Sequence, residues 1–404
     1  MHRRIIYFLI IMLLNFGFCY SQNNIHILKS ISSLDTNFQD LQFLNKTLQN
    51  VKVVGLGEQS HYDGSTYEAK VRLIKYLHEN LNFDVIAFES GIYDCNKAND
   101  EIQNSHETNQ QSLFNAIFGV WHTKEVAELA KYINETQSTS HPLILAGFDC
   151  QFSGEYSKKY FVEDYFKVLQ KIENKTGIKI LKDTSLLARA LRKEIKFSNY
   201  YNKLPKEDTL LLYNNFNQFY EIAKKDSTRE ILKWVSLLQN MQIDYRRHFN
   251  MNSGSRDSMM AINILQLCNI TFKNKKLMLW SANTHLSFDR DYSKVKARAG
   301  VSIKQSLNDK YYCILTTSIN AGYRIFFAKL KFPKIKNNSI ESCLKQNNQP
   351  YQFIDFRKQY DMIPSNWLES SSVYGHFITD HNVSKITDGL LFIETINPPQ
   401  EISK

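Results

Sequence analysis

Short apolar runs near the start of the chain alternate with amphipathic helical patterns, and this alternation constrains the fold more than any other feature. The runs are rich in β-branched residues and short, which is typical of buried strands: Val51–Gly57, Phe83–Glu89 and Leu143–Asp149. The patterns between them predict helices over Tyr67–Asn80 and Thr123–Thr136, with Thr123 as the N-cap of the second. Strands and helices in this order predict an α/β fold with a parallel sheet covered by helices.

A long segment without strand patterns follows the third strand. From about residue 158 to residue 273 only helical patterns occur: Tyr160–Thr176, Thr184–Phe197, Lys206–Lys225, Thr228–Asn250 and a helix from near Ser255 to about Ile270. Strand patterns then return at Leu277–Ala282, Tyr312–Thr317, Arg324–Leu330 and Gly389–Glu394. We expect the tail after Phe332 to be irregular up to the last of these strands. The sequence therefore predicts one α/β domain over residues 22–404, a mostly parallel sheet flanked by helices, with an inserted helical subdomain at about 155–273.

Residues 1–21 have the layout of a secretory signal peptide. A basic start at Arg3 and Arg4 precedes a mostly apolar run from Ile5 to Phe18, and Cys19 and Ser21 supply small residues at positions −3 and −1 of a cleavage site. The run is shorter than the ~20 residues of a membrane helix, and an uncleaved N-terminal anchor is the alternative. We expect an exported protein of the periplasm or the extracellular space, with no stable membrane span after cleavage, and a monomer.

Composition and motifs exclude several classes of function. A hydrophobic content of 43% with 13% aromatic residues is enough for a sizeable core, so the chain is not mainly disordered. The net charge is +10, but the basic residues are scattered or in short runs, so we expect no nucleic-acid partner. The sequence contains no GxSxG, P-loop, GxGxxG, HExxH or zinc-binding spacing. The five cysteines after the signal peptide include no CxxC pair, and we expect at most one or two disulfides.

Polar side chains suited to acid–base chemistry follow four of the predicted strands. Glu58 and His61 follow the first, Glu89 ends the second, Asp149 ends the third and His285 follows the fourth. Because ligands bind outside the carboxyl ends of strands in such sheets, we expect these groups to converge on one crevice. Carboxylates and histidines are the usual groups of general acid–base catalysis. The same side chains suit Zn²⁺ or Mn²⁺, so a metal-dependent hydrolase at the same crevice is an alternative.

The order of several short motifs resembles that of the erythromycin esterase family. Gly57-Glu58-Gln59-Ser60-His61 matches the opening Gly-Glu-x-Thr/Ser-His motif, and Lys70–Leu77 matches the helix that follows it. The other matches, in order, are Glu89, Trp121, Glu125-Val126, Gly147-Phe148-Asp149, Arg256-Asp257, Met260-Ala261-Ile262-Asn263, Trp280–His285, Gly300, Leu307, Gly322 and Asp388. Each motif is short, but together they span Val51 to Ile393, which is nearly the whole chain after the signal peptide.

The resemblance implies a metal-independent or metal-sparing ester hydrolase that acts on a small-molecule ester with a histidine-activated water and needs no other cofactor. Carried over position by position, His61 deprotonates the attacking water, and Glu58 and Glu89 orient that water and His61. His285 then binds or polarises the substrate carbonyl. The resemblance assigns four further positions to substrate binding, Arg256, Lys70, Asp149 and Trp121, with anchoring of the helical insertion as the alternative role of Arg256.

Two positions depart from the family pattern. Ala282 stands where the family usually has the first His of its His-Asn-x-His motif, and Lys70 stands where the macrolide esterases have Arg. The methyl group of Ala282 can neither donate a hydrogen bond nor transfer a proton. The departures leave three activities open: hydrolysis of macrolide lactones, with antibiotic resistance as its consequence; hydrolysis of another ester; or binding without catalysis by an envelope protein of the same fold.

Overall fold

The fold is organised around one large sheet. The structure is a computed structural model, and it describes residues 25–104, 110–180, 183–197, 204–226, 228, 231, 233–241, 255–289, 298–321, 324–325, 328–329, 335–358 and 363–402. The eight-stranded sheet has the order β1-β10-β13-β6-β2-β5-β3-β4. Its strands are β1 Ile25–Ile27, β2 Val53–Leu56, β3 Phe83–Gly91, β4 Ile144–Asp149, β5 Lys276–Trp280, β6 Tyr311–Thr317, β10 Tyr351–Asp355 and β13 Gly389–Ile393.

Most of the neighbouring strands in this sheet are parallel. From β13 to β4 every pair runs in the same direction, and only β10 is antiparallel to its neighbours β1 and β13. The predicted fold class, a mostly parallel sheet flanked by helices, is confirmed. The strands predicted at Val51–Gly57, Phe83–Glu89, Leu143–Asp149 and Leu277–Ala282 correspond to β2, β3, β4 and β5.

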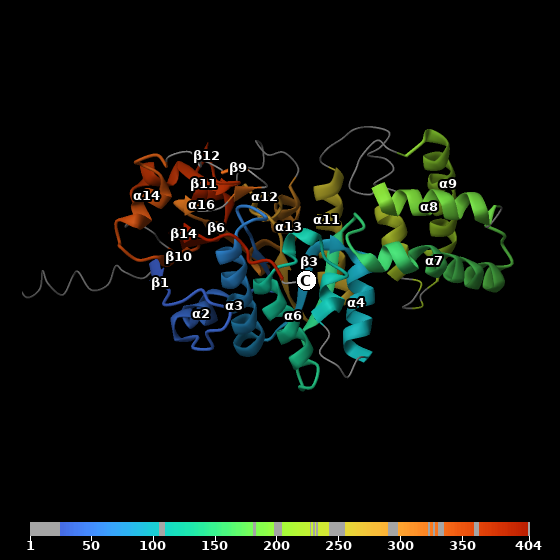
Figure 1. Ribbon diagram of the computed structural model, residues 1–404, viewed down its shortest axis with the longest axis horizontal. Coiled ribbons are helices and arrows are strands. Elements are labelled where there is room, and N and C mark those ends of the chain that lie inside the picture. Colours follow the sequence, from blue (N-terminus) through green and yellow to red (C-terminus); the bar gives the residue numbers. More distant parts are fainter. Residues whose placement is uncertain are drawn as a thin grey trace, which may run out of the picture.

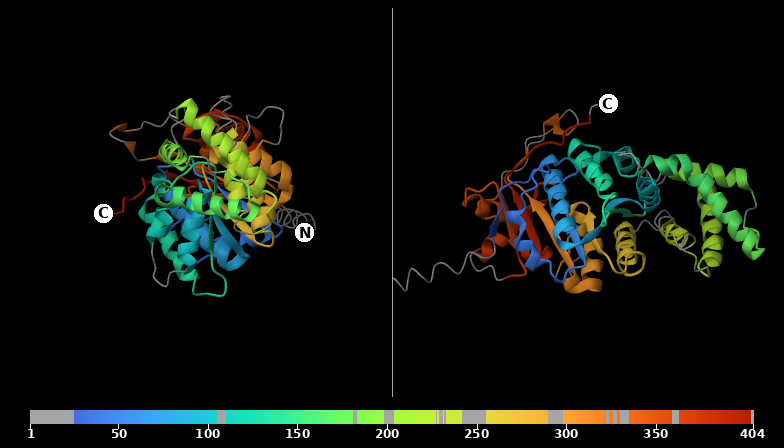
Figure 2. Two further views of the ribbon diagram at one scale, coloured as in Figure 1. Left: turned by 90° about the vertical axis from the view of Figure 1, so that its right-hand side faces the viewer. Right: turned by 90° about the horizontal axis from the view of Figure 1, so that it is seen from below.

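Helices cover both faces of the sheet (Figures 1 and 2). They are α2 Phe43–Thr47, α3 Gly64–Leu81, α4 Ile92–Asn104, α5 Gln110–Phe114, α6 Lys124–Thr136, α11 Ser255–Gln266, α12 Asn283–Leu286, α13 Ala299–Leu307, α14 Ile340–Lys345, α15 Ser365–Leu368 and α16 Val383–Ile386. Successive residues of β2 point to opposite faces, as the pleat of a strand requires. Val54 packs in one core cluster with Val71 of α3 and Val126 of α6, whereas Val53 packs in a second cluster with Met260 of α11.

The two helices predicted between the first strands are present as α3 and α6. Thr123 is the N-cap of α6, and its hydroxyl accepts a hydrogen bond from the backbone N–H of Val126 at 3.3 Å, as predicted. α3 begins three residues before the predicted start, at Gly64, directly after the segment that carries His61.

Between β4 and β5 the described residues form helices. These are α7 Glu155–Thr176, α8 Thr184–Phe197, α9 Lys206–Ala223, a helix that includes residues 233–241, and α11, which continues into a π-helical turn at Leu267–Thr271. The part of the expected helix Thr228–Asn250 beyond residue 241 lies outside the described residues. Helices α7, α8 and α9 form a lobe to one side of the sheet, which is green in Figure 1 and projects to the right in the second view of Figure 2.

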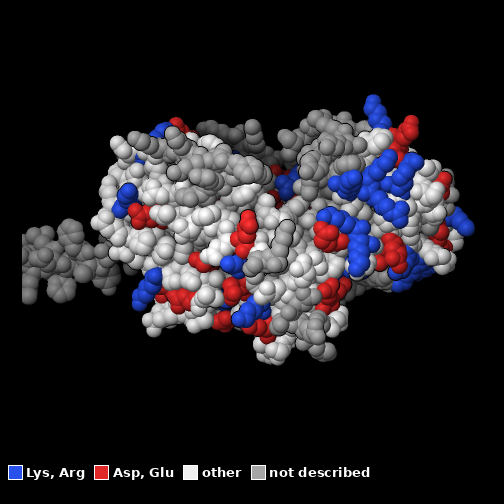
Figure 3. Space-filling view, in the orientation of Figure 1, with Lys and Arg blue, Asp and Glu red and all other residues white. Residues whose placement is uncertain are grey.

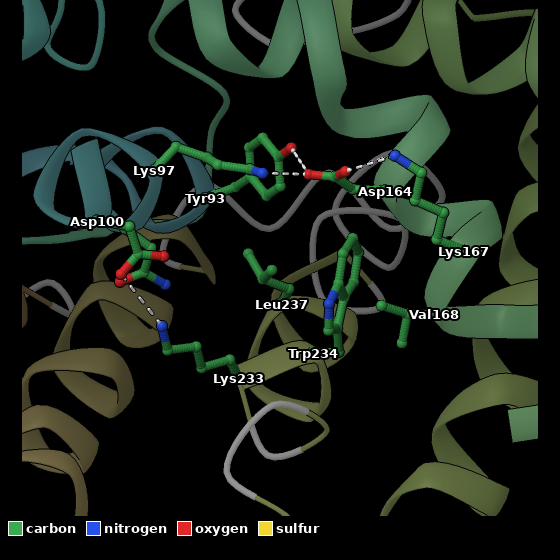
Figure 4. Close-up of a pocket in the computed structure, with 10 residues that line it drawn as sticks. Tyr93, Lys97, Asp100, Asp164, Lys167, Val168, Lys233, Trp234 and Leu237 are labelled. Carbon is green, nitrogen blue, oxygen red and sulfur yellow. Dashed lines mark hydrogen bonds and ion pairs between the residues drawn. The ribbon is translucent and has the colours of Figure 1, made fainter. Parts of the chain in front are cut away.

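Polar contacts join this lobe to α4. The carboxylate of Asp164 in α7 accepts a hydrogen bond from Tyr93 at 2.7 Å and pairs with Lys97 at 2.5 Å, both on α4. Lys233 pairs with Asp100 at 3.7 Å. These residues surround a pocket between α4, α7 and the helix of residues 233–241 (Figure 4). The lobe is thus attached beside the end of β3, because α4 follows that strand directly.

The positive charge of the chain is concentrated in this helical region rather than scattered. Residues 155–273 contain 21 Lys and Arg against 13 Asp and Glu, a net charge of +8 out of the total of +10. Figure 3 shows many Lys and Arg side chains on the lobe of α7 and α8, with acidic side chains between them. The rest of the chain is nearly neutral overall, so the electrostatics of a site at the sheet depend on local pairs of charges.

The expectation of an irregular tail after Phe332 is wrong. β10 lies inside the sheet between β1 and β13, and β11 Ser370–Tyr374 pairs with β12 Phe377–Asp380 in a hairpin. The predicted strand Arg324–Leu330 is not a strand of the large sheet in its described part, where two-residue strands at Arg324–Ile325 and Ala328–Lys329 pair with each other. A third small pair joins Asn320–Ala321 to Thr395–Ile396.

The five described cysteines, Cys95, Cys150, Cys268, Cys313 and Cys343, are all free thiols. No helix within the described residues is both long and apolar enough to cross a membrane. The expected signal peptide, residues 1–21, lies outside the described residues.

Candidate active site

The carboxyl ends of four adjacent strands bring the predicted site residues together. β2, β5, β3 and β4 are consecutive neighbours in the sheet and run in parallel, so the segments that follow them meet at one edge. Glu58 lies just after β2, and Glu89 lies near the carboxyl end of β3. Asp149 is the last residue of β4, and His285 lies in α12, which follows β5. The predicted convergence at one edge is thus observed.

Glu58 is the centre of one half of this site and is fully buried. Its Oε1 contacts Nδ1 of His61 at 2.8 Å and accepts a hydrogen bond from the indole Nε1 of Trp121 at 2.9 Å. Its Oε2 accepts from the Lys70 ammonium at 2.6 Å, and that ammonium lies 4.0 Å above the ring of Trp280. Every partner of this carboxylate is therefore a donor, which keeps Glu58 ionised and fixed in orientation.

Close backbone packing holds Glu58 in place. The backbone N–H of Asn283 donates to the carbonyl of Glu58 at 2.8 Å, and the amide of Asn283 donates to the carbonyls of Thr316 and Val373 at 2.8 and 2.6 Å. A Cβ at Gly57 would lie 2.1 Å from Oδ1 of Asn283. Only glycine at position 57 leaves room for this bridge between the ends of β2, β5 and β6.

Glu89 is the centre of the other half. Its Oε1 pairs with the Arg256 guanidinium at 3.0 Å and with Nε2 of His285 at 3.2 Å. Its Oε2 accepts from the hydroxyl of Ser281 at 2.6 Å and from the backbone N–H of Ala282 at 3.1 Å. The backbone of Ala282 thus contributes to the site, although its side chain cannot.

Arg256 connects Glu89 to Asp149. Its Nε donates to Oδ1 of Asp149 at 3.2 Å, and its terminal nitrogen pairs with Oδ2 of the same carboxylate. Arg256 comes from α11, which lies near the end of the helical segment between β4 and β5, whereas the two carboxylates lie near the carboxyl ends of β3 and β4. This pairing ties the start of α11 to the sheet edge.

Two residues that the sequence interpretation did not assign a role complete the arrangement. Asp257 contacts Nδ1 of His285 at 2.8 Å, so both ring nitrogens of His285 face carboxylates. Ser281 donates to Glu89, as described above. Asp257 belongs to the Arg256-Asp257 motif, in which the sequence predicts a role for the arginine alone. The sequence signal for Ser281 is its place directly after β5.

Burial and charge shift the pKa values of these groups in different directions. Burial alone would raise the pKa of Glu58, but the charges of Lys70 and His61 hold it below its usual range. Burial likewise opposes ionisation of Glu89, yet His285 and Arg256 hold its pKa well below the usual range. Burial lowers the pKa of Lys70 to about 8 despite the neighbouring Glu58.

The two histidines of the site both have raised pKa values. Burial acts to lower the pKa of His61, but the hydrogen bond and charge of Glu58 outweigh it, and the charges of Glu89 and His285 act on His61 as well. For His285 the same burial penalty is outweighed by Glu89 and Asp257, which raise its pKa to about 10. His285 is therefore an imidazolium at neutral pH.

Exposure separates the residues that a small molecule can reach from those that support them. The side chains of His61, Arg256 and His285 are 37%, 20% and 17% exposed. In contrast, the residues Lys70, Trp121 and Asp149 are each at most 1% exposed. The structure places these three against Glu58 or Arg256, and their contact with a substrate stays a prediction.

Within the described residues, no three or more His, Cys, Asp or Glu side chains are grouped as a metal site requires. The carboxylate oxygens of Glu58 and Glu89 instead accept from ammonium, guanidinium, imidazole, indole and hydroxyl donors. What the arrangement provides is a partly exposed histidine on a carboxylate, beside two partly exposed cations.

The stability of the fold should depend on pH through His285. A histidine whose pKa is raised on folding stabilises the folded chain while it is protonated there. For His285 this contribution is complete below about pH 6.5 and is lost as the pH rises toward about 10. We expect the free energy of unfolding to fall over this range, and to fall less steeply in His285→Gln. Urea unfolding at a series of pH values measures both slopes, and equal slopes would contradict the assignment.

Comparison with known proteins gives the same fold and a family. A putative hydrolase of Bacillus subtilis, YbfO, is 27% identical over 89% of this chain and 87% of its own length. The erythromycin esterase type II of Escherichia coli is 21% identical over 91% of this chain and 95% of its own length. The crystal structure of a succinoglycan biosynthesis protein superposes with a TM-score of 0.74 at 18% identity, covering 93% of this chain and 96% of that one.

The family model of erythromycin esterase matches residues 78–396. The match includes Glu89, Asp149, Arg256 and His285, whereas Glu58 and His61 precede it and are reached by the alignments with the two relatives over most of the chain. The motif order had indicated the same family. Because the match extends over more than three quarters of the sequence, this chain belongs to the erythromycin esterase family.

Proposed function

We propose that this chain is a hydrolase of carboxylic esters or lactones that uses a water molecule activated by His61. Membership of the erythromycin esterase family and the similarity to a putative hydrolase support hydrolysis as the reaction class. The observation that carries the finer proposal is the contact between His61 and the buried Glu58 at 2.8 Å, with the ring of His61 partly exposed.

The hydrogen bond to Glu58 assigns the tautomer of His61. Because an ionised carboxylate only accepts, Nδ1 of His61 carries the proton and donates it to Glu58. Nε2 of the neutral ring is then the atom that takes a proton from water as the water attacks the ester carbon. The raised pKa of His61 makes it a stronger base, and it requires a pH above that pKa for the neutral form to predominate.

Arg256 and His285 supply positive charge beside this base. As water adds to the ester carbonyl, negative charge develops on the carbonyl oxygen, and nearby fixed cations stabilise it. Both cations are already oriented by Glu89, and His285 is held on its second nitrogen by Asp257. We assign Glu58, Lys70 and Trp121 to the positioning of His61, and Glu89 and Asp149 to the positioning of the two cations.

The proposed substrate class is a small-molecule ester. The side chain at position 282 is one feature that affects which ester the site accepts. Position 282 offers only a backbone N–H, which donates to Glu89, and Lys70 is occupied with Glu58. The chain therefore lacks one imidazole that the family pattern has at this edge. A macrolide lactone and simple aliphatic or aryl esters are the substrates to be compared.

His61→Ala is expected to reduce hydrolysis of the preferred ester about 10²–10⁴-fold, which is the usual contribution of a general base. The measurement is kcat/KM on a panel of aryl esters, aliphatic esters and macrolides. His141→Ala is the matched control, because His141 pairs with Asp84 near the start of β3, away from the carboxyl edge. Equal hydrolysis by His61→Ala and the control would refute the proposed role of His61.

A further inference from the structure

A second buried pair of a carboxylate and a histidine lies next to the segment that carries His61. Oδ1 of Asp63 contacts Nε2 of His376 at 2.9 Å, and Nδ1 of His376 contacts the hydroxyl of Ser318 at 3.2 Å. Asp63 is fully buried, and His376 and Ser318 are 5% and 3% exposed. Nothing in the proposed chemistry uses these three residues directly.

Asp63 occupies the N-cap position of α3 but does not cap that helix. An aspartate at this position usually accepts a backbone N–H of the first helical turn. Here its side chain makes no such bond. Its Oδ2 instead accepts from the backbone N–H of Ser60 at 3.1 Å, inside the segment of residues 57–63, while its other oxygen meets His376. Asp63 thus links this segment to a distant part of the chain.

That distant part is the hairpin of β11 and β12. Tyr374 pairs with Phe377, and the two residues between them, Gly375 and His376, both have φ of 62°. Two-residue hairpin loops of this kind favour Asn and Gly because both positions need positive φ. A histidine there costs about 1–2 kcal/mol relative to glycine. The buried contact of His376 with Asp63 compensates for this unfavourable backbone conformation.

The hairpin holds the segment of residues 57–63 at two further points. The backbone N–H of Gly375 donates to the carbonyl of Gln59 at 2.9 Å, and the amide of Gln59 donates to the carbonyl of Ser372 at 2.7 Å. On the opposite side, the hydroxyl of Tyr67 donates to the carbonyl of His61. The backbone around His61 is therefore fixed from the hairpin and from α3 together.

We propose that His376 and Asp63 are positioning residues: through Ser60 they set the conformation of residues 57–63 and so hold the ring of His61 against Glu58. The inference rests on the proposed role of His61 as the base. In this arrangement Nε2 of His376 donates to the carboxylate of Asp63, and Nδ1 accepts from Ser318. The hairpin of residues 370–380, which the sequence interpretation took as irregular, then becomes part of the catalytic apparatus.

The order Asp63–His376–Ser318 is also that of a catalytic triad, but burial assigns it the supporting role. A serine nucleophile must be reached by the substrate carbonyl, and the structure leaves Ser318 only 3% exposed. We expect no reaction of the wild-type protein with a fluorophosphonate probe at Ser318, as judged by peptide mass spectrometry. Covalent labelling of Ser318 would overturn the positioning role.

The decisive variant is His376→Gly, which removes the imidazole and suits the positive φ. The readout is the titration of His61 in the full chain, followed by the imidazole ¹H–¹³C signals and assigned by comparison with His61→Ala. The charges that raise or lower its pKa are Glu58, Glu89 and His285. Because His376→Gly alters none of them, a change in the titration reports the geometry of the contact between His61 and Glu58.

We expect the pKa of His61 to fall toward its ordinary value in His376→Gly, because the hydrogen bond to Glu58 is weakened. Asp63→Asn, which keeps the shape of the side chain, should shift it in the same direction. The control is Asn348→Gly, an exposed residue with φ of 50° outside this region, which should leave the titration unchanged. An unchanged His61 titration in folded His376→Gly would overturn the proposal.

Measurements of ester hydrolysis separate a failure of this inference from a failure of the proposed function. With an ester that the wild type hydrolyses, we expect His376→Gly to lower kcat about 10-fold or more with little change in KM, since the base is misoriented and the cations are not. The double variant His376→Gly/Asp63→Asn should lose no more activity than the less active of the two single variants, because both residues act through one contact. If no ester is hydrolysed, the proposed function fails, while the titration still decides the positioning role.

Discussion

Replacing Glu58 by alanine is expected to lower the free energy of unfolding by about 3–5 kcal/mol and to reduce ester hydrolysis, by no more than His61→Ala does. The stability loss arises because the Lys70 ammonium, which is 1% exposed, would lose its carboxylate partner and stay buried. The activity loss arises because His61 would lose the group that orients its ring and fixes its tautomer.

A second variant separates the two effects of Glu58→Ala. Glu58→Ala combined with Lys70→Met removes the unpaired charge, so it should recover much of the stability but none of the activity. Urea denaturation and kcat/KM on the same preparations test both statements. A stability loss below about 1 kcal/mol in Glu58→Ala would mean that Lys70 finds another partner and that the pair is not the anchor of the site.

Several features of this site follow from the local pattern of the sequence. A parallel sheet needs buried apolar strands, and the runs around Val54, Ile86 and Leu145 are long enough and apolar enough to reveal them. Their carboxyl ends must meet at one edge, so Glu58 and Glu89 were placed near each other from strand order alone. The family resemblance added Arg256 and Trp121, which no strand pattern points to.

What the sequence did not reveal depends on partners far along the chain. β10 was missed because its strand contains a buried Gln352, whose amide is satisfied by the carbonyls of Leu344 and Gln349. Periodicity assigns such a polar residue to the surface. His376 was missed for a related reason: its partner Asp63 lies 313 residues earlier, and a histidine in a turn is indistinguishable from a solvated one without the fold.

The roles of the buried polar residues were also only partly predictable. The sequence predicts that Lys70 and Trp121 contact substrate; the structure shows that each donates a hydrogen bond to Glu58 inside the protein, and the substrate contact itself stays a prediction. A sequence shows that a polar group belongs to a site, whereas burial decides whether that group faces the ligand or a neighbouring side chain.

Replacing Arg256 by alanine is expected to lower the free energy of unfolding near neutral pH by about 3–5 kcal/mol and to reverse its dependence on pH in the acidic range. Arg256 pairs with Glu89 and Asp149, which are 3% and 1% exposed, and its loss would leave two buried carboxylates without their shared guanidinium. Hydrolysis should fall as well, since in the proposed mechanism Arg256 supplies positive charge to the developing oxyanion.

The pH dependence makes this prediction specific. In the wild type the pKa of Glu89 lies well below its ordinary value of 4.5, so its stabilising contribution is present above that value and is lost as the pH falls further. In Arg256→Ala the pKa of Glu89 should lie higher than in the wild type, because His285 alone of the two cations then opposes the effect of burial, and the variant should gain stability relative to the wild type as the pH falls toward the range in which Glu89 takes up a proton. The control is Arg189→Ala, because Arg189 also pairs with an aspartate, Asp208, but is 57% exposed and should cost at most about 1 kcal/mol at any of these pH values. Urea unfolding of the three proteins between pH 5 and pH 8 decides the matter: a deficit in Arg256→Ala that does not shrink toward acidic pH would show that the guanidinium does not hold Glu89 in its ionised form.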